Sequence, residues 1–162
     1  MKKKILRFLN QPKFLRHWMN WYRPYRGAGI KVTKLADDFS SATVQMPLRG
    51  FNTNYVGVHF GGSLYSMIDP FFMLLVMNQL GRDYVVWDIE ANIKFISPGK
   101  STVSAQFNVT PEQIQEIKNN TNNNEKYLPT FHVDILSDDG TLVAKASKTL
   151  YIRKKSGGAL QN

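Results

Sequence analysis

Cysteine is absent from this chain of 162 residues, and histidine occurs only three times. The lack of cysteine excludes disulfide scaffolds, cysteine-ligated metal centres and thiolate catalysis. His17, His59 and His132 lie far apart in the sequence, so we expect no metal site. A membrane-spanning helix needs an uncharged apolar run of about 18 residues or more. The chain has no such run, and we expect a cytoplasmic protein.

Acidic residues are missing from the start of the chain, because the first one is Asp37. The segment 1–26 instead carries eight cations: Lys2, Lys3, Lys4, Arg7, Lys13, Arg16, Arg23 and Arg26. Subtracting these eight from the net charge of +9 leaves +1 for the rest of the chain. Proteins that bind nucleic acid usually spread their cations over a folded face, so we expect no nucleic-acid partner.

Residues 1–27 are predicted to form a basic, amphipathic, helical extension. Phe14, Leu15, Trp18 and Met19 follow a helical spacing, and Pro12 either starts or interrupts that helix. The pattern leaves two interpretations open. In the first, which we favour, the helix packs on its own domain or on a partner subunit. In the second, residues 2–26 lie on an anionic membrane surface, because tryptophan, lysine and arginine favour the membrane interface. The protein would then be peripheral at the membrane.

The remaining chain is predicted to be one domain, residues 28–153, followed by a flexible tail, 154–162. Its hydrophobic content and length suffice for a buried core. Alternating and turn patterns predict strands at 30–36, 41–48, 85–95, 102–109, 131–135 and 141–153, a long helix at 61–81 and a short one from Pro111 to about Lys118. Asp139-Gly140 is expected to turn the last two strands into a hairpin.

The segment 61–81 is apolar on nearly every side, so a helix there must be buried on every side. In the strand 85–95, the odd-numbered residues from Val85 to Phe95 are the apolar set and are expected to face the core. The compact solution is a strongly curved antiparallel sheet wrapped around one apolar helix. This is an α+β protein with the hotdog arrangement.

A motif supports that arrangement. The stretch from Asn54 to Gly62 (NYVGVHFGG), followed after six residues by Asp69, resembles the pattern N-x-x-G-x-x-H-G-G, six residues, acid of phenylacetyl-CoA thioesterase-like hotdog proteins. The stretch ANIKFISPG, residues 91–99, is similar to the strand and turn that follow the helix in that family. The resemblance covers residues 28–153 and is strongest to a poorly characterised branch of tetrameric acyl-CoA thioesterases. One position departs: Phe60 stands where the family has histidine, and His59 lies one residue earlier.

The resemblance implies an acyl-CoA thioesterase without cofactor, a homodimer or a dimer of dimers, acting on an acyl-CoA or an acyl carrier. It implies that Asp69 acts as general base or nucleophile and that Asn54 and His59 position water or the carbonyl. The amides of Gly61 and Gly62 open the helix and suit an anionic oxygen. Asp69 lies about 12 Å along an ideal helix from Gly61, too far to serve the same carbonyl within one chain. In the resembled family the sites form between two subunits. If this chain is such an enzyme, the spacing therefore implies a dimer in which Asp69 of one chain serves the helix start of the other.

A second interpretation of Asp69 stays open. Asp69-Pro70 has the form of an N-cap followed by proline at the first helical position, which would break the 61–81 helix. Asp69 would then only cap the second half of the helix. The protein would be a non-catalytic hotdog module that binds acyl chains or lipid.

At the family-like turn after the strand 85–95, Pro98 and Gly99 occupy the central positions of a predicted type II turn.

Overall fold

The structure is a computed structural model that describes residues 11–156. The predictions for residues 1–10, and for the tail from 157 onward, lie outside the described residues. The elements in chain order are helices α2 (Pro12–Trp21) and α3 (Arg23–Ala28), strands β1 (Lys31–Leu35) and β2 (Ser41–Met46), 3₁₀ helix η1 (Gly50–Asn52), helices α4 (Gly61–Ile68) and α5 (Phe71–Leu80), strands β3 (Tyr84–Phe95) and β4 (Val103–Asn108), helix α6 (Pro111–Asn120), and strands β5 (Lys126–Tyr127), β6 (Thr130–Ser137) and β7 (Leu142–Lys154).

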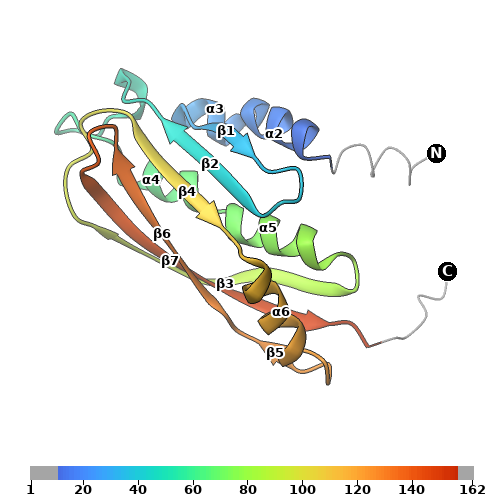
Figure 1. Cartoon of the computed structure of the whole chain (residues 1–162). Coiled ribbons are helices and arrows are strands. Elements are labelled where there is room, and N and C mark those ends of the chain that lie inside the picture. Colours follow the sequence, from blue (N-terminus) through green and yellow to red (C-terminus); the bar gives the residue numbers. More distant parts are fainter. Residues whose placement is uncertain (1–10, 157–162) are drawn as a thin grey trace.

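The strands form one antiparallel sheet in the order β1-β2-β4-β6-β7-β3, with the short β5 paired to β7. The sheet curves around α4 and α5, which lie against its inner face (Figure 1). Side chains of both helices and of the inner sheet face build one core, in which Phe71 and Phe72 pack on Phe107. The predicted α+β class and hotdog arrangement are confirmed.

The central helix is broken, as the proline predicts. α4 ends at Ile68 and α5 begins at Phe71, because Pro70 has no amide proton to donate to the carbonyl of Ser66. Both halves are buried, with Met67 and Leu75 fully excluded from solvent. The break places Asp69 at the midpoint of the helical rod.

Strand β3 differs from the predicted alternation. Its pairing with β7 shifts register between Asp88 and Glu90, so Ile89 is an extra residue in a β-bulge. A single inserted residue exchanges the two faces of a strand. Trp87, expected in the core, therefore lies outside, where its ring stacks on Tyr151 at 4.5 Å. Asp88 instead shares the inner face with its cross-strand partner Leu150.

Helices α2 and α3 cover the free edge of the sheet at β1 (Figure 1). Pro12 occupies the first turn of α2 and starts the helix. The Asn20 side chain accepts from the Val32 N–H at 2.8 Å and donates to the Val32 carbonyl at 3.1 Å, which satisfies the edge strand. Met19 and Tyr25 belong to the core. Helix α2 thus packs on its own domain, as the favoured interpretation expects.

The short helix after β4 begins at Pro111, as predicted, and the hairpin lies at Asp139-Gly140. Thr110 and Gln113 form a reciprocal capping box at the start of α6. Gly140 takes a positive φ of 84° in the hairpin between β6 and β7. Among residues 11–156, no helix is long and apolar enough to cross a membrane.

Candidate active site

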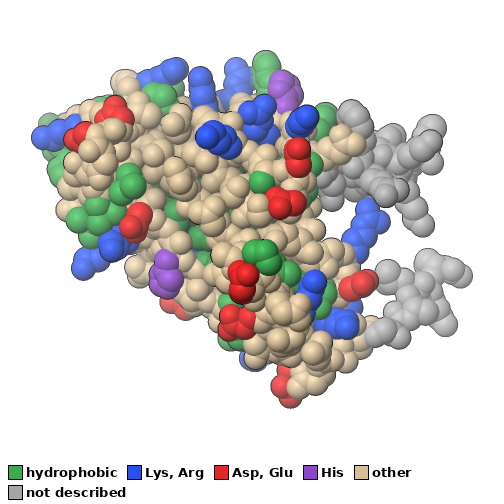
Figure 2. Space-filling view, in the orientation of Figure 1, with side chains coloured by type: hydrophobic (Ala, Val, Ile, Leu, Met, Phe, Trp, Pro, Cys, Tyr) green, Lys and Arg blue, Asp and Glu red, His purple; other side chains and the backbone are tan. Residues whose placement is uncertain are grey.

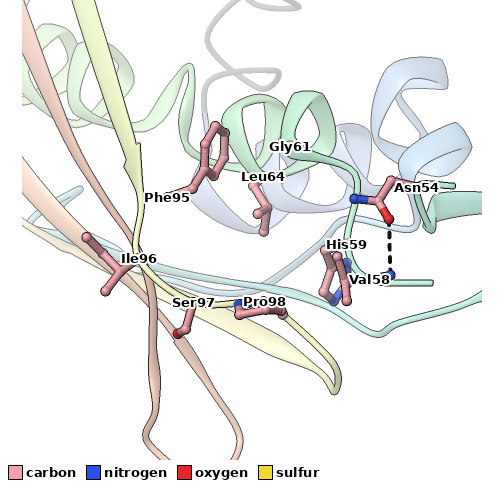
Figure 3. Close-up of a pocket in the computed structure, with 10 residues that line it drawn as sticks. Asn54, Val58, His59, Gly61, Leu64, Phe95, Ile96, Ser97 and Pro98 are labelled. Atoms are coloured by element: carbon pink, nitrogen blue, oxygen red, sulfur yellow. Dashed lines mark hydrogen bonds between the residues drawn. The ribbon is translucent and has the colours of Figure 1, made fainter. Parts of the chain in front are cut away.

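The stretch from Asn54 to Gly61 folds into one wall of a pocket. The pocket has a volume of about 460 Å³. It lies between the loop before α4 and the end of β3, and Figure 3 shows its lining: Asn54, Val58, His59, Gly61, Leu64, Phe95, Ile96, Ser97, Pro98 and Gly99. Three of the five predicted site residues therefore lie together in one chain, and Gly62 follows them in the first turn of α4.

Asn54 organises the loop. Its Oδ1 accepts from the amides of Val56 at 3.0 Å and Val58 at 3.2 Å, while its backbone amide donates to the Val58 carbonyl. This Asx turn needs Gly57 at a φ of 80°. The side-chain nitrogen Nδ2 has no acceptor within the described part of the chain. In Figure 3 it lies on the side of Asn54 that faces the start of α4. It is a free donor at the pocket.

His59 is a buried clamp between this loop and the turn after β3. Its Nε2 donates to the Ser101 carbonyl at 2.8 Å, and its backbone amide donates to the Gly99 carbonyl at 3.0 Å. Burial lowers the pKa of His59, although the bond to Ser101 opposes this, so the ring is neutral at pH 7. Its Nδ1 is buried without a partner among residues 11–156. The imidazole thus lines the pocket, but its hydrogen bond serves mainly to join the loop to the turn after β3.

Helix α4 offers free amides to the pocket. The amides of Ser63 and Leu64 already donate to the Phe60 carbonyl. Those of Gly61 and Gly62 have no acceptor within the region that the structure describes, as expected for the first residues of a helix. A Cβ at Gly61 would lie 2.9 Å from the Phe95 ring, so any larger residue there would force this ring to shift.

The turn from Ser97 to Gly99 does not have the predicted type II geometry, because Gly99 lacks the positive φ of that turn. Glycine is needed there for another reason. A Cβ at Gly99 would lie 3.0 Å from the His59 ring and 3.3 Å from Val143. Close packing against the clamp, rather than backbone conformation, explains this glycine.

Asp69 lies in a different environment, at the break of the central helix. Its Oδ1 accepts a hydrogen bond of 2.8 Å from Lys148 Nζ. The Lys148 side chain is 1% exposed and the Asp69 side chain is 49% exposed. The same Nζ lies 3.3 Å from Asp88 Oδ1, and it is 5.8 Å from the centre of the Tyr65 ring. A buried ammonium thus links the carboxylate at the α4–α5 break to a carboxylate of β3.

The charged groups of this cluster shift one another's pKa. Burial lowers the pKa of Lys148, but the hydrogen bond and charge of Asp69, with Asp88, outweigh it and leave the pKa above its ordinary value. Lys148 is therefore charged at neutral pH. Burial raises the pKa of Asp88, against the opposing effect of Lys148. A buried cation between two acids fixes the Asp69 carboxylate in one orientation.

A second, smaller hollow of about 240 Å³ opens at Asp69 and is lined by Tyr22, Pro24, Tyr25, Tyr65, Ser66, Asp69 and Pro70. The hydroxyl of Tyr25 is buried and has no hydrogen-bond partner among residues 11–156. Burial and the charge of Asp69 raise the pKa of Tyr25, so the phenol keeps its proton. Aromatic rings from α3 and α4 thus surround the exposed half of the carboxylate.

The two halves of the predicted site lie apart within one chain. The hollow at Asp69 shares no lining residue with the pocket at Gly61. The interpretation of Asp69 as a helix cap is wrong, because α5 begins after Pro70 without any side-chain cap and the carboxylate bonds Lys148 instead. No group of three or more His, Asp or Glu side chains able to hold a metal occurs in residues 11–156.

Sequence reasoning missed Lys148 and Asp88. The signal for Lys148 was present, since it continues the even-numbered apolar face of β7 formed by Ala144, Ala146, Leu150 and Ile152. A lysine in that phase must find a counter-charge in the interior. Asp88 gave no such signal, because the bulge that turns it inward is not visible in the alternation.

Fold and site together define a hotdog-fold protein with an acid at the midpoint of its central helix. The chain belongs to the DUF4442 family, described as a domain of unknown function, whose model matches residues 11–152. The match includes α2 and α3, so the family resemblance extends further toward the N-terminus than the predicted limits of 28–153. A comparison with curated proteins found no match.

Solved structures share the fold. PA5026 from Pseudomonas aeruginosa, described as a protein of unknown function and probable thioesterase, is similar with a TM-score of 0.78 at 16% identity, over 88% of this chain and 95% of that one. Thioesterase HI1161 from Haemophilus influenzae gives 0.64 at 16% identity, over 88% and 90%. A variant of thioesterase SAV0944 from Staphylococcus aureus gives 0.59 at 15% identity, over 80% and 97%. At these identities the similarity shows the fold alone.

Proposed function

We propose that this protein hydrolyses an apolar acyl or aryl thioester, carried by coenzyme A or an acyl-carrier protein, at a site shared by two subunits. The observation that carries the proposal is Asp69. Its carboxylate is held by the fully buried Lys148, while half of its side chain is exposed and faces a hollow lined by aromatic residues. Supporting observations are the hotdog fold and the thioesterase descriptions of its structural neighbours.

In the proposed reaction, Asp69 takes a proton from water as the water oxygen attacks the thioester carbonyl. Lys148 occupies Oδ1, which leaves Oδ2 for the water. The oxyanion that forms would accept from the amides of Gly61 and Gly62 and from Asn54 Nδ2. Breakage of the C–S bond then releases the thiolate, which gains a proton, and the carboxylic acid. Donors preset for such an oxyanion supply a large part of hydrolytic rate enhancement.

Two subunits are needed because Asp69 follows Gly61 by eight residues and opens into a separate hollow. Two features support association. Strand β3 is an edge of the sheet, and a long unpaired edge is a template for pairing with another chain. Large apolar side chains around the Gly61 pocket are also exposed, namely Val56, Phe60, Phe95 and Ile96. A second copy would cover them and bring its Asp69 to the pocket.

The direct test is release of free thiol from a panel of acyl-CoA substrates. We expect hydrolysis by the wild type and a loss of about 10²–10⁴-fold in kcat for Asp69→Asn, the usual contribution of a general base. Asp134→Asn, an exposed carboxylate on β6, is the matched control and is expected to keep full activity. Binding of acyl-CoA without hydrolysis would favour the alternative, a non-catalytic acyl-binding module.

The shared site has its own test. Asp69→Asn and Asn54→Asp chains are each expected to be inactive as homo-oligomers. When the two are co-expressed, random pairing gives about a quarter of the sites an intact Asp69 from one chain and an intact Asn54 from the other. We therefore expect about a quarter of wild-type activity to return. No recovery, with mixed oligomers present, would show that each site lies within one chain.

A further inference from the structure

The outer face of α2 and α3 carries aromatic side chains that lie outside the core. Trp18 is 53% exposed, Trp21 60% and Tyr22 46%. The packing of α2 on the domain is made instead by Leu15 and Met19. Exposed tryptophans cost solvation free energy in water, so three adjacent exposed aromatic residues suggest a face made for contact.

These rings are already ordered. Trp18 and Tyr22 stack with ring centres 5.4 Å apart. Arg26 places its guanidinium 4.9 Å from the centre of the Trp21 ring. Little conformational entropy remains to be lost when such a face binds. We call the surface formed by Trp18, Trp21, Arg23 and Arg26 the aromatic–basic face. Tyr22 stacks on Trp18 at its border but lines the hollow at Asp69.

Cations surround this face. Figure 2 shows Lys and Arg side chains gathered along the edge of the molecule where α2 and α3 lie in Figure 1. The sequence adds four more cations at positions 2–7 and no acid before Asp37. Next to the face, a hollow of about 410 Å³ is lined by Arg26, Lys31 and Arg49, besides Asn20, Gly29, Ile30 and Phe51. The cations that line it suit a phosphate group.

We propose that the aromatic–basic face binds the surface of an anionic phospholipid membrane. Tryptophan and tyrosine favour the boundary between headgroups and acyl chains, and nearby Lys and Arg are attracted to anionic headgroups. Arg26 links the two parts, since it contacts Trp21 and also lines the hollow. A nucleic acid fits less well, because the chain beyond position 26 carries a net charge of only +1.

The test uses the full-length protein and sedimentation with vesicles. We expect binding to mixed phosphatidylcholine–phosphatidylglycerol vesicles, little binding to phosphatidylcholine alone, and weaker binding as salt increases. The double variant Arg23→Gln/Arg26→Gln should bind about thirtyfold more weakly, since each cation near an anionic surface contributes about fivefold. Lys126→Gln/Lys145→Gln removes the same charge from exposed positions elsewhere and should bind like the wild type.

The aromatic part is tested separately with Trp18→Ala/Trp21→Ala, which should weaken vesicle binding about tenfold or more without lowering Tm, because both side chains are exposed. In a Trp87→Phe background, anionic vesicles should shift the emission of the two remaining tryptophans to the blue. Absence of binding to anionic vesicles overturns the proposal. So does dissociation of the oligomer by the double tryptophan variant, which would assign this face to a second copy, or stronger binding to nucleic acid than to vesicles.

Discussion

The two pockets along the broken central helix differ in the chemical groups that line them. The pocket at Gly61 is lined by backbone amides, a neutral histidine and apolar side chains, and its preset donors are uncharged. The hollow at Asp69 is lined mainly by aromatic side chains, and its one charged lining residue, Asp69, pairs with the buried Lys148. A donor site stabilises charge that develops during a reaction, while a charged site exchanges protons. This difference underlies the proposal that the reaction needs both pockets, one from each of two subunits.

The largest effect on kcat in this comparison is expected for Asn54→Asp, in the pocket at Gly61. Aspartate keeps the oxygen that accepts from Val56 and Val58, so the loop and Tm should be unchanged. It removes the Nδ2 donor and adds a negative charge where the oxyanion would form. We expect a fall of about 10²–10³-fold in kcat, the usual effect of one lost oxyanion donor. Equal activity in both proteins would remove Asn54 from the proposed reaction.

Lys148→Met removes the cation that pairs with Asp69. It leaves Asp69 and Asp88 without their shared cation, and we expect a loss of about 1–3 kcal/mol in unfolding free energy, reduced because Asp69 is half exposed. Urea denaturation measures it. Lys145→Met, on the solvent face of the same strand, should change stability by less than about 0.5 kcal/mol. Lys148→Arg should recover part of kcat if the cation orients Asp69.

Gly61→Ala perturbs the neutral pocket more gently. The new Cβ would lie 2.9 Å from the Phe95 ring, which lines the pocket, and the ring must shift. We expect kcat/KM to fall about tenfold, or about 1.4 kcal/mol, with little change in Tm. Gly50→Ala is the control, because no atom lies within 4 Å of its Cβ position. Phe95→Leu combined with Gly61→Ala should restore part of the activity.

The smallest effect is expected for His59, on the pH dependence of the unfolding free energy. Its pKa in the folded state lies below the ordinary value of about 6.5, so the unfolded chain takes up a proton first as pH falls. The stabilising contribution is therefore complete above about pH 6.5 and is lost as pH falls through the lower, folded-state pKa. His59→Gln keeps a donor for Ser101 but does not titrate. The difference in stability between the two proteins should shrink toward acid pH by about 1 kcal/mol or less.

Much of the arrangement follows from local sequence. The apolar 61–81 segment had to be buried on all sides, Pro70 had to break it, and the spacing from Asn54 to Gly61 placed loop and helix start in one pocket. Patterns of two and 3.6 residues carry such information because they report which face of an element is apolar. The β-bulge escaped them, since one extra residue at Ile89 exchanges the faces of β3 without changing its composition.

By itself the sequence determined that an acid would stand at the centre of a buried, proline-broken helix. Only the tertiary structure decided what that acid contacts there. Sheet registry brings Lys148 to Asp69 from a distant part of the chain, and the bulge turns Asp88 toward the same ammonium. A lone carboxylate at a helix break would serve equally as a cap, and Asp69 is not one because a buried cation must be neutralised by the nearest acids. Such pairings depend on distances that chain folding sets, which no local pattern encodes.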